Sequence, residues 1–154
     1  MHRPCTTIFR LQIGEVLKSW AVPKGPSTDP RDKRLAIPTE DHPLDYGDFE
    51  GVIPKKRYGG GVVMLWDRGT FRNVTENDGR LQPLEEAWKQ GQLRVELRGE
   101  KLAGGYALHR TGSEKDANWL LVKVDDEAAD ARRNPVSTEP KSVKSGRTIE
   151  QIER

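Results

Sequence analysis

The stretch Phe9–Val22, FRLQIGEVLKSWAV, carries the strongest structural signal in the chain. Its first five residues alternate apolar and polar side chains, and this period of two is typical of a half-buried strand. A glycine and a glutamate then form a two-residue turn into a second run, Val16–Val22. We therefore expect an opening β-hairpin whose first strand turns its phenylalanine and leucine to the core and Arg10 to the opposite face.

Further runs of the same kind follow the hairpin. We expect strands at residues 34–37, 62–66, 70–74, 93–98, 104–110 and 118–124. The runs at 62–66 and 70–74 are expected to pair as a second hairpin through the turn 67–69. One short helix is expected from Pro83 to Gln90, ended by Gly91. About eight strands and one helix predict an all-β fold, an antiparallel sandwich or barrel.

Composition is consistent with one small domain. The 154 residues are 34% hydrophobic and 32% charged and include 15 glycines and 10 prolines, which favours many turns around a modest interior. We expect a folded domain over residues 1–124 and a flexible linker or tail over 125–154, where charged, small and proline residues dominate.

The chain has no signal for membrane insertion or secretion. No apolar run approaches the length needed to cross a bilayer, and the first residues lack the apolar core of a signal peptide. Cys5 is the only cysteine, so no internal disulfide can form. We expect a cytoplasmic protein. The formal net charge of only +2 means that a nucleic-acid partner would be bound by a local basic patch.

The proline-rich stretch Trp20–Pro54 is the best candidate for such a patch. It lacks any helical or strand period that would explain its polar side chains, and its prolines restrict the backbone. These residues predict an anion site. Its candidate residues are Lys24, Arg31, Lys33, Arg34, Glu40, His42 and Tyr46.

His42 lies among acidic residues, with Glu40, Asp41 and Asp45 close by in sequence. Neighbouring carboxylates favour the charged imidazole, which suits phosphate binding or general acid catalysis. The alternative is a histidine that only stabilises a turn. The same choice applies to the basic residues: Arg31 and Lys33 are interspersed with aspartates, as in a solvated surface run.

The remaining candidates favour structural roles. His109 has no acidic or histidine neighbour and is interpreted as structural or surface-exposed. The four tryptophans fall at strand or helix positions, which favours core packing over base stacking. The triglycine before Val62 lacks the Lys-Ser/Thr of a phosphate-binding loop, and dinucleotide fingerprints and paired CxxC motifs are absent from the sequence.

Longer strings of the sequence point to a family. The segment FRLQIGEVLKSWAVPKGPSTDPRDKRLAIPTEDHPLDYGDFEGVIP resembles the 3′-phosphoesterase domain of bacterial DNA ligase D, a manganese-dependent repair module that trims 3′ ends before ligation. The resemblance continues through YGGGVVMLWDRGTF, LRVELRGEKLAGGYALHRT and NWLLVK, so it covers about residues 9–124. It implies a small closed antiparallel β-barrel.

The resemblance also implies a site. In the family, two histidines and an aspartate hold Mn²⁺, and an arginine and a histidine clamp a phosphate. It assigns Arg10 and His42 of this chain as phosphate contacts. The surrounding site would comprise Lys24, Arg34, Glu40 and Tyr46.

The chain departs from the family at the metal ligands. Where the family has His-Tyr-Asp-Phe-Arg-Leu, this sequence has Thr6-Thr7-Ile8-Phe9-Arg10-Leu11, and the family's other histidine would precede Met1. Threonine and isoleucine do not replace imidazole and carboxylate as Mn²⁺ ligands. One hypothesis is a frameshift. If the codons TGC ACT ACG ATT encode Cys5 to Ile8 and a C precedes them, the frame one nucleotide back reads CTG CAC TAC GAT, which encodes Leu-His-Tyr-Asp.

These observations predict a domain that processes DNA 3′ ends and whose metal-dependent activity is impaired. A non-catalytic nucleic-acid-binding or interaction module is the alternative. The expected partners are DNA 3′ ends, with a DNA ligase or the end-joining protein Ku as further candidates, and no membrane.

Overall fold

The described part of the chain forms antiparallel β-sheets and one short helix, which confirms the predicted all-β class. The computed structural model describes residues 7–44, 51–53, 61–63, 67–112, 117–129 and 142–146. The strands are β1 Thr7–Ile13, β2 Val16–Val22, β3 Lys33–Pro38, β4 His42–Pro43, β5 Gly51–Ile53, β6 Gly61–Val63, β7 Gly69–Asn73, β8 Glu76–Asn77, β9 Arg80–Leu81, β10 Gln92–Gly99, β11 Ala103–Arg110 and β12 Trp119–Lys123. The helix α1 spans Leu84–Gln90.

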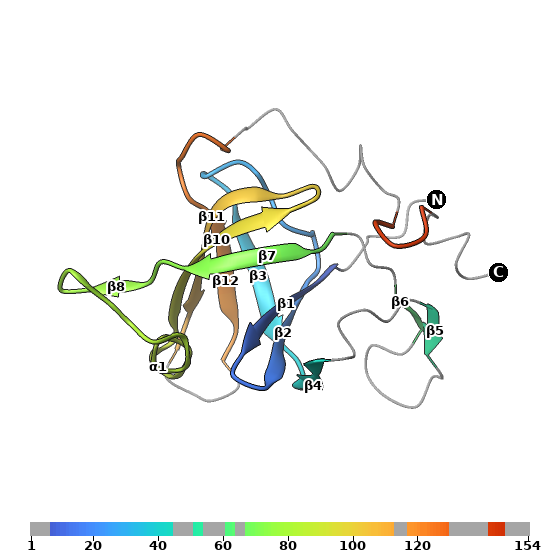
Figure 1. Ribbon diagram of the computed structural model, residues 1–154, viewed down its shortest axis with the longest axis horizontal. Coiled ribbons are helices and arrows are strands. Elements are labelled where there is room, and N and C mark those ends of the chain that lie inside the picture. The colour runs from blue at the N-terminus through green and yellow to red at the C-terminus, as the bar shows by residue number, and fades with distance from the viewer. Residues whose placement is uncertain are drawn as a thin grey trace.

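The main sheet curves around one core (Figure 1). Its strand order is β1-β2-β3-β12-β11-β10-β7, and β4 pairs with β2 off this path. Among the described residues no pairing joins the end strands β1 and β7, so the sheet is a half-barrel. The closed barrel that the family resemblance implied is therefore not what the described strands form.

The predicted opening hairpin is confirmed. Ile13 pairs with Val16 across the two-residue loop, and Gly14 has the positive φ of 66° that such a tight turn requires. Burial alternates along the first strand: Leu11 is 2% exposed, whereas Gln12 is exposed. Arg10 accordingly lies on the face opposite the core, as predicted.

The predicted second hairpin is wrong. Gly61–Val63 pairs with Gly51–Ile53, and Gly69–Asn73 pairs with β10 instead. Asp67 does not turn the chain back on itself, because its carboxylate accepts hydrogen bonds from the backbone N–H groups of residues 100–102 in the β10–β11 loop. A Cβ at Gly69 would lie 2.0 Å from the Arg98 carbonyl oxygen, so only glycine permits this close approach of β7 to β10.

A hairpin that the sequence analysis missed joins β8 and β9. Asp78 and Gly79 have φ values of 54° and 77°, and Asn77 pairs with Arg80 across them. Two consecutive positive φ angles define a type I′ turn, for which Asp-Gly is a preferred sequence. The Asp-Gly dipeptide was therefore the signal available in the sequence.

The helix forms at the predicted place. Pro83 stands at its N-cap, and Gly91 ends it in the left-handed conformation with φ of 80°. Ala87 is buried against the sheet, while Leu84 and Trp88 pack at the edge of the core. The helix therefore covers one end of the half-barrel.

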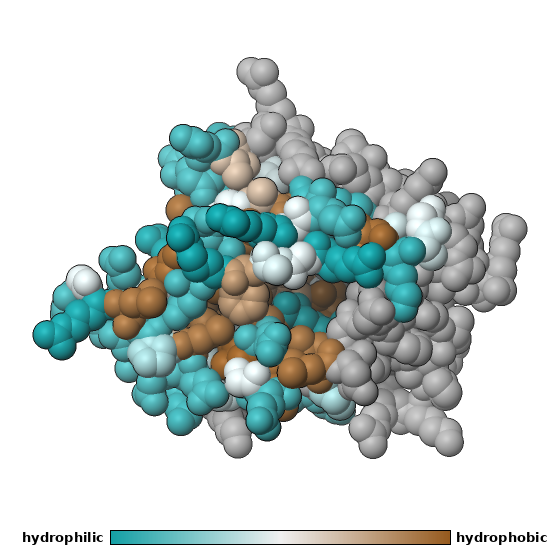
Figure 2. Space-filling view, in the orientation of Figure 1, coloured by the Kyte–Doolittle hydropathy of each residue, from teal (hydrophilic) through white to brown (hydrophobic). Residues whose placement is uncertain are grey.

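The core lies on the inner face of the sheet. Trp20 and Trp119 meet there in an edge-to-face contact with ring centroids 5.4 Å apart, and Phe9 packs against Trp20 at 6.3 Å. These contacts confirm the predicted packing role of Trp20 and Trp119; Trp66 lies outside the described residues. Figure 2 shows hydrophobic side chains reaching the surface beside the hydrophilic strand β7.

Hydrogen bonds of Lys123 and Asp126 hold the segment 124–129 against the sheet. Lys123 is fully buried and donates hydrogen bonds to the carbonyl oxygens of Gly105 and Val124 and to the Asp126 carboxylate. The Gly105 N–H in turn donates to Asp126 at 2.7 Å. This segment is therefore attached to β11. The boundary expected at residue 124 remains a prediction.

Candidate functional site

The candidate anion site begins on the outer face of β1 and β2. Arg10 is half-buried and stands opposite Ser19. The inner side of the same strand is anchored by Phe9 against Trp20 and by buried Leu11. Because Phe9 and Leu11 pack on the inner face of β1, Arg10 is held on the outer face at a fixed position along the strand.

The backbone of His42 lies on the other side of β2. It pairs with Leu17, two residues from Ser19 and hence on the same face of β2. Arg10 and His42 are thus separated by two strand spacings, about 10 Å across the sheet. This register brings the backbone of His42 and the strand of Arg10 to opposite edges of β2, and their shared contact with one phosphate remains a prediction.

Glu40 and Asp41 precede His42 in the segment that leaves β3. The N–H of Thr39 donates to the Ser19 carbonyl oxygen at 2.9 Å, and Lys18 Nζ donates to Asp41 Oδ2 at 2.8 Å. Glu40 is exposed. The Asp41 carboxylate, expected from sequence to favour a charged His42, is thus also bound by a lysine from β2.

Lys24 lies at an exposed turn after β2. The N–H of Gly25 donates to the Val22 carbonyl oxygen at 2.9 Å, and the glycine has a φ of 72°. Pro23 restricts the turn further. Lys24 is therefore presented to solvent beside the sheet, where it can reach an anion.

Arg34 belongs to β3, as predicted, but to the other face of the sheet. It pairs with buried Leu121 and alternates with Leu35, which is 41% exposed. Its guanidinium lies 3.6 Å from Asp32, and its Nε atom is buried without a hydrogen-bond partner among the described residues. A shared contact of Arg34 and Arg10 with one anion remains a prediction. Tyr46 lies outside the described residues.

The interpretation of Arg31 as a surface residue agrees with its surroundings. Arg31 is exposed and donates two side-chain hydrogen bonds to Asp29. These bonds lower the pKa of the Asp29 carboxyl and raise that of the guanidinium. Lys33 is exposed as well. His109 is exposed on β11. Partial desolvation of its imidazole and the charge of the nearby Arg94 both lower its pKa.

The described residues do not fit a metal centre. Within them, no three histidine, cysteine or carboxylate side chains come together in a way that could hold a metal ion. Ile8, two residues before Arg10 on β1, stands where the resemblance places the metal-binding aspartate, and it is 38% exposed on the face of Arg10. An isoleucine offers no donor atom to a metal. Cys5 and Thr6 lie outside the described residues.

Taken together, fold and register define a small all-β domain that carries Arg10 on the outer face of β1. A family model of the DNA ligase D 3′-phosphoesterase domain matches residues 8–110. The chain belongs to this family.

Relatives with curated descriptions agree with the family. The chain is 49% identical over 144 residues to the multifunctional non-homologous end joining protein LigD of Pseudomonas aeruginosa. The aligned residues make up 92% of this chain and 16% of that protein. It is 40% identical over 119 residues to the multifunctional non-homologous end joining DNA repair protein LigD of Mycobacterium tuberculosis, covering 77% and 14%. The chain thus spans only a small part of these relatives' length. Among the described residues, no helix is long and apolar enough to cross a membrane.

Proposed function

We propose that this chain is a DNA 3′-end-processing module that recognises a terminal 3′-phosphate through Arg10 and His42 and whose manganese-dependent hydrolysis is impaired. The observation that supports the proposal is the register that pairs Arg10 with Ser19 and the backbone of His42 with Leu17, on either side of β2. An arginine and a charged imidazole can both donate hydrogen bonds to phosphate oxygens, and such charge-assisted bonds are strong. Lys24 adds a cation beside them.

Family membership supports the DNA end as substrate. The relatives are named as non-homologous end joining proteins, so a terminal phosphate on a DNA strand is the anion that best fits this chain. A 3′-ribonucleoside is a further substrate of the proposed reaction. A separate ligase or Ku protein would supply the sealing step, and we propose these as partners.

The impairment follows from the donor atoms at the start of β1. Mn²⁺ would neutralise the phosphoryl oxygens during hydrolysis. Ile8 occupies the place of a carboxylate ligand, and loss of ligands from a three-ligand site removes most metal affinity. The remaining cations would then bind a 3′-phosphate without hydrolysing it.

The test is to restore the family segment. Thr6→His, Thr7→Tyr and Ile8→Asp would place a carboxylate on the face of Arg10, because residues 8 and 10 share one side of the strand. We expect Mn²⁺-dependent phosphate release from a 3′-phosphorylated primer to rise at least tenfold. A matched control carries Gln12→Asp in place of Ile8→Asp, which adds the same charge on the same face but two residues after Arg10 instead of two before it.

Each outcome decides between the candidate functions. Turnover by the unaltered chain at the rate of the restored one would contradict the impairment. Equal affinity of the unaltered chain for 3′-phosphate and 3′-hydroxyl ends would contradict phosphate recognition. Phosphate-dependent binding with no turnover, even after restoration, would instead support the non-catalytic nucleic-acid-binding module.

A further inference from the structure

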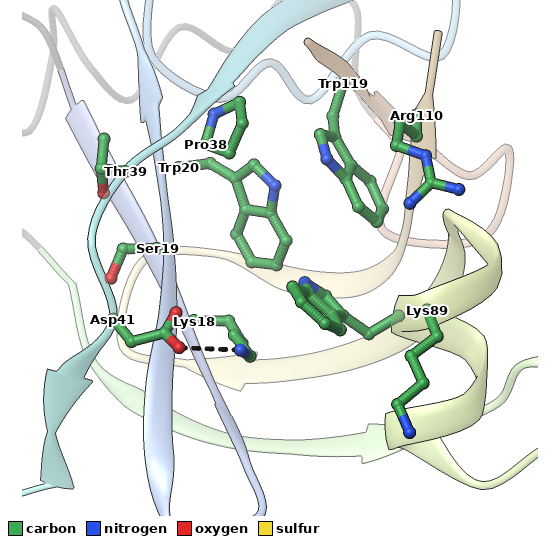
Figure 3. A pocket seen from close by; sticks show the side chains of 10 residues that line it. Lys18, Ser19, Trp20, Pro38, Thr39, Asp41, Lys89, Arg110 and Trp119 are labelled. Atoms are coloured by element: carbon green, nitrogen blue, oxygen red, sulfur yellow. Dashed lines mark hydrogen bonds and ion pairs between the residues drawn. The ribbon is translucent and has the colours of Figure 1, made fainter. Parts of the chain in front are cut away.

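A pocket lies on each face of the main sheet. The one on the core face, between β2, β3 and β4, has a volume of about 280 Å³. Its indoles Trp20 and Trp119 are buried and pack against each other, and its Lys18 is bound to Asp41, as the dashed line in Figure 3 marks. These side chains already have partners within the fold, so we assign no ligand to this pocket.

The pocket on the outer face, which we call the outer groove, lies over β10 and β11 and has a volume of about 460 Å³. Gln92 and Arg94 alternate on β10 with the core residue Leu93, so their side chains point outward. Gly105 and Ala107 lie beside them on β11, where small residues leave space above the sheet. The volume falls within the roughly 300–1,000 Å³ of small-molecule sites.

Three side chains with hydrogen-bond donors line the outer groove, namely Gln92, Arg94 and His109. Gln92 and His109 are directly opposite in the register of β10 and β11, and Arg94 is two residues from Gln92 on the same face. Within the part of the chain that the structure describes, none of the three side chains has a hydrogen-bond or ion-pair partner. Their donors are therefore available to a ligand.

The backbone of Arg94 is fixed by the segment that follows β7. Its N–H donates to Thr75 Oγ1 at 2.9 Å, and the Thr75 hydroxyl donates back to the Arg94 carbonyl oxygen at 3.1 Å. The Val74 N–H donates to the same carbonyl oxygen at 2.8 Å. Thr75 is only 5% exposed. Because this anchor is buried, the arginine has little backbone freedom to lose when it binds a ligand.

Two of the three carboxylates in the lining are paired with cations. Asp126 is bound by Lys123 at 2.7 Å, and Glu96 is bound by Arg72 at 3.1 Å. Glu76 is exposed on β8 and has no ion-pair partner among the described residues. The groove thus combines one unpaired guanidinium and two neutral donor groups with a single unpaired carboxylate at its rim.

We propose that the outer groove binds a phosphate group through Arg94, Gln92 and His109. A guanidinium can donate to two oxygens of a tetrahedral anion, and the amide and the imidazole can donate to the others. A carboxylate has only two oxygens and would leave donors unused. His109 lies four strands from Arg10, roughly 20 Å across the sheet, so this site is separate from the candidate anion site and independent of the proposed function.

The experiment titrates the full chain with inorganic phosphate at constant ionic strength and follows the NMR signals of the groove residues. We expect saturable shifts that persist in Arg10→Ala. Arg94→Ala should weaken phosphate binding in the groove about tenfold, because charge-assisted hydrogen bonds are lost. Arg98→Ala is the matched control, since this arginine is exposed on the same face of β10 but outside the lining. Shifts that do not saturate, or equal losses from both variants, would overturn the inference.

Two further measurements distinguish an anion site from a merely structural role. Glu76→Gln removes the unpaired carboxylate and should tighten phosphate binding about twofold. The charged groups that line the groove with His109 are Arg94, Glu76, Glu96 and Asp126. A bound anion opposes the effect of the arginine, so sulfate, whose charge is constant between about pH 5 and 8, should raise the pKa of the imidazole. A pKa that sulfate leaves unchanged would contradict the proposal.

Two probes identify the source of the phosphate. A single-stranded oligonucleotide with hydroxyl groups at both ends offers only backbone phosphates, whereas thymidine monophosphate offers a terminal one. Displacement of inorganic phosphate by the oligonucleotide would support the site and assign it to the DNA backbone, and displacement by the nucleotide alone would support it for a small phosphorylated ligand. If no probe shifts the groove signals, the inference fails. Loss of phosphate binding at Arg10 alone contradicts only the proposed function.

Discussion

Two lysine–aspartate pairs of nearly equal length hold segments against the sheet at different places. Lys123 and Asp126 are 2.7 Å apart, and Lys18 and Asp41 are 2.8 Å apart. The side chains of Lys123 and Asp126 are 0% and 34% exposed, whereas those of Lys18 and Asp41 are 17% and 47% exposed. Distance therefore does not distinguish these pairs, and burial does.

The difference in burial separates a structural pair from one that a ligand can reach. The Lys123 ammonium has three N–H groups, and its three acceptors are two carbonyl oxygens and a carboxylate. Lys18 contacts one carboxylate and one indole ring at the edge of a pocket. An exposed pair of this kind contributes little to stability, so the Lys18 contacts can change on binding at low cost.

The largest effect should come from Asp126→Ala. It leaves the Lys123 ammonium buried with only two carbonyl acceptors and removes the acceptor of the Gly105 N–H. We expect the free energy of unfolding to fall by about 2 kcal/mol, less than for a fully buried pair because the Asp126 side chain is 34% exposed. Urea denaturation measures it. Asp41→Ala is the matched control and should lower the free energy of unfolding by less than about 1 kcal/mol. Equal losses from the two substitutions would contradict the difference proposed between the two pairs.

The next effect is the pH dependence of the buried pair. Burial alone would raise the pKa of the Asp126 carboxyl, but hydrogen bonds from Lys123, Gly105 and Ala128 lower it below its ordinary value. A carboxyl whose pKa is lower in the folded protein stabilises it above the unfolded pKa, and this contribution is lost as pH falls through the folded value.

Urea unfolding of the wild type and Asp126→Asn should therefore differ most near neutral pH. The difference should shrink below about pH 4, the ordinary pKa of an aspartate. The asparagine keeps the shape of the side chain and cannot titrate. If the stability difference between the wild type and Asp126→Asn stays constant at every acidic pH at which both proteins fold, Asp126 acts through packing alone.

Lys18→Met tests the exposed pair and should have a smaller effect on stability. The methionine keeps an apolar chain against Trp88 but removes the cation from the ring and from Asp41. We expect the free energy of unfolding to fall by less than about 1 kcal/mol. The same replacement at Lys123 is the control and should cost more, because it removes three hydrogen bonds of a fully buried ammonium, to the Asp126 carboxylate and to two carbonyl oxygens.

The smallest effect concerns the salt dependence of DNA binding. Each phosphate contact made with single-stranded DNA contributes about 0.7 to the slope of log affinity against log salt concentration. Lys24→Ala should reduce this slope by about that amount for a 3′-phosphorylated strand, because Lys24 is the exposed cation proposed to lie beside the phosphate contacts. Arg72→Ala on β7 should leave it unchanged; a change of the same size would place the DNA elsewhere on the sheet.

Much of the fold was predictable because its signals are local. Alternation and a two-residue glycine turn specify the hairpin at residues 9–22, and Gly91 ends the helix because it adopts a φ of 80° without a Cβ clash. Family-specific strings likewise identified the candidate phosphate contacts. None of these inferences depends on how distant parts of the chain meet.

The candidate site was only partly predictable for the same reason. Sequence placed Arg34 near His42, but strand alternation puts Arg34 on the face opposite Arg10. It correctly interpreted Trp88 as a packing residue but did not indicate that this indole also lines a pocket at the end of β3. Such juxtapositions depend on which strands become neighbours.

The sequence by itself determined the all-β class, the first hairpin, the helix and the family, because turns and periodicity act over a few residues and motifs are read directly. Tertiary structure alone decided the partners of β6 and β7, the burial of Lys123 and the opening between β2, β3 and β4. Strand pairing joins residues far apart in the chain, and its outcome depends on the packing of the whole core. The β1 face that carries Arg10 and Ile8 combines both: its residues are set by sequence, and its neighbours by the fold.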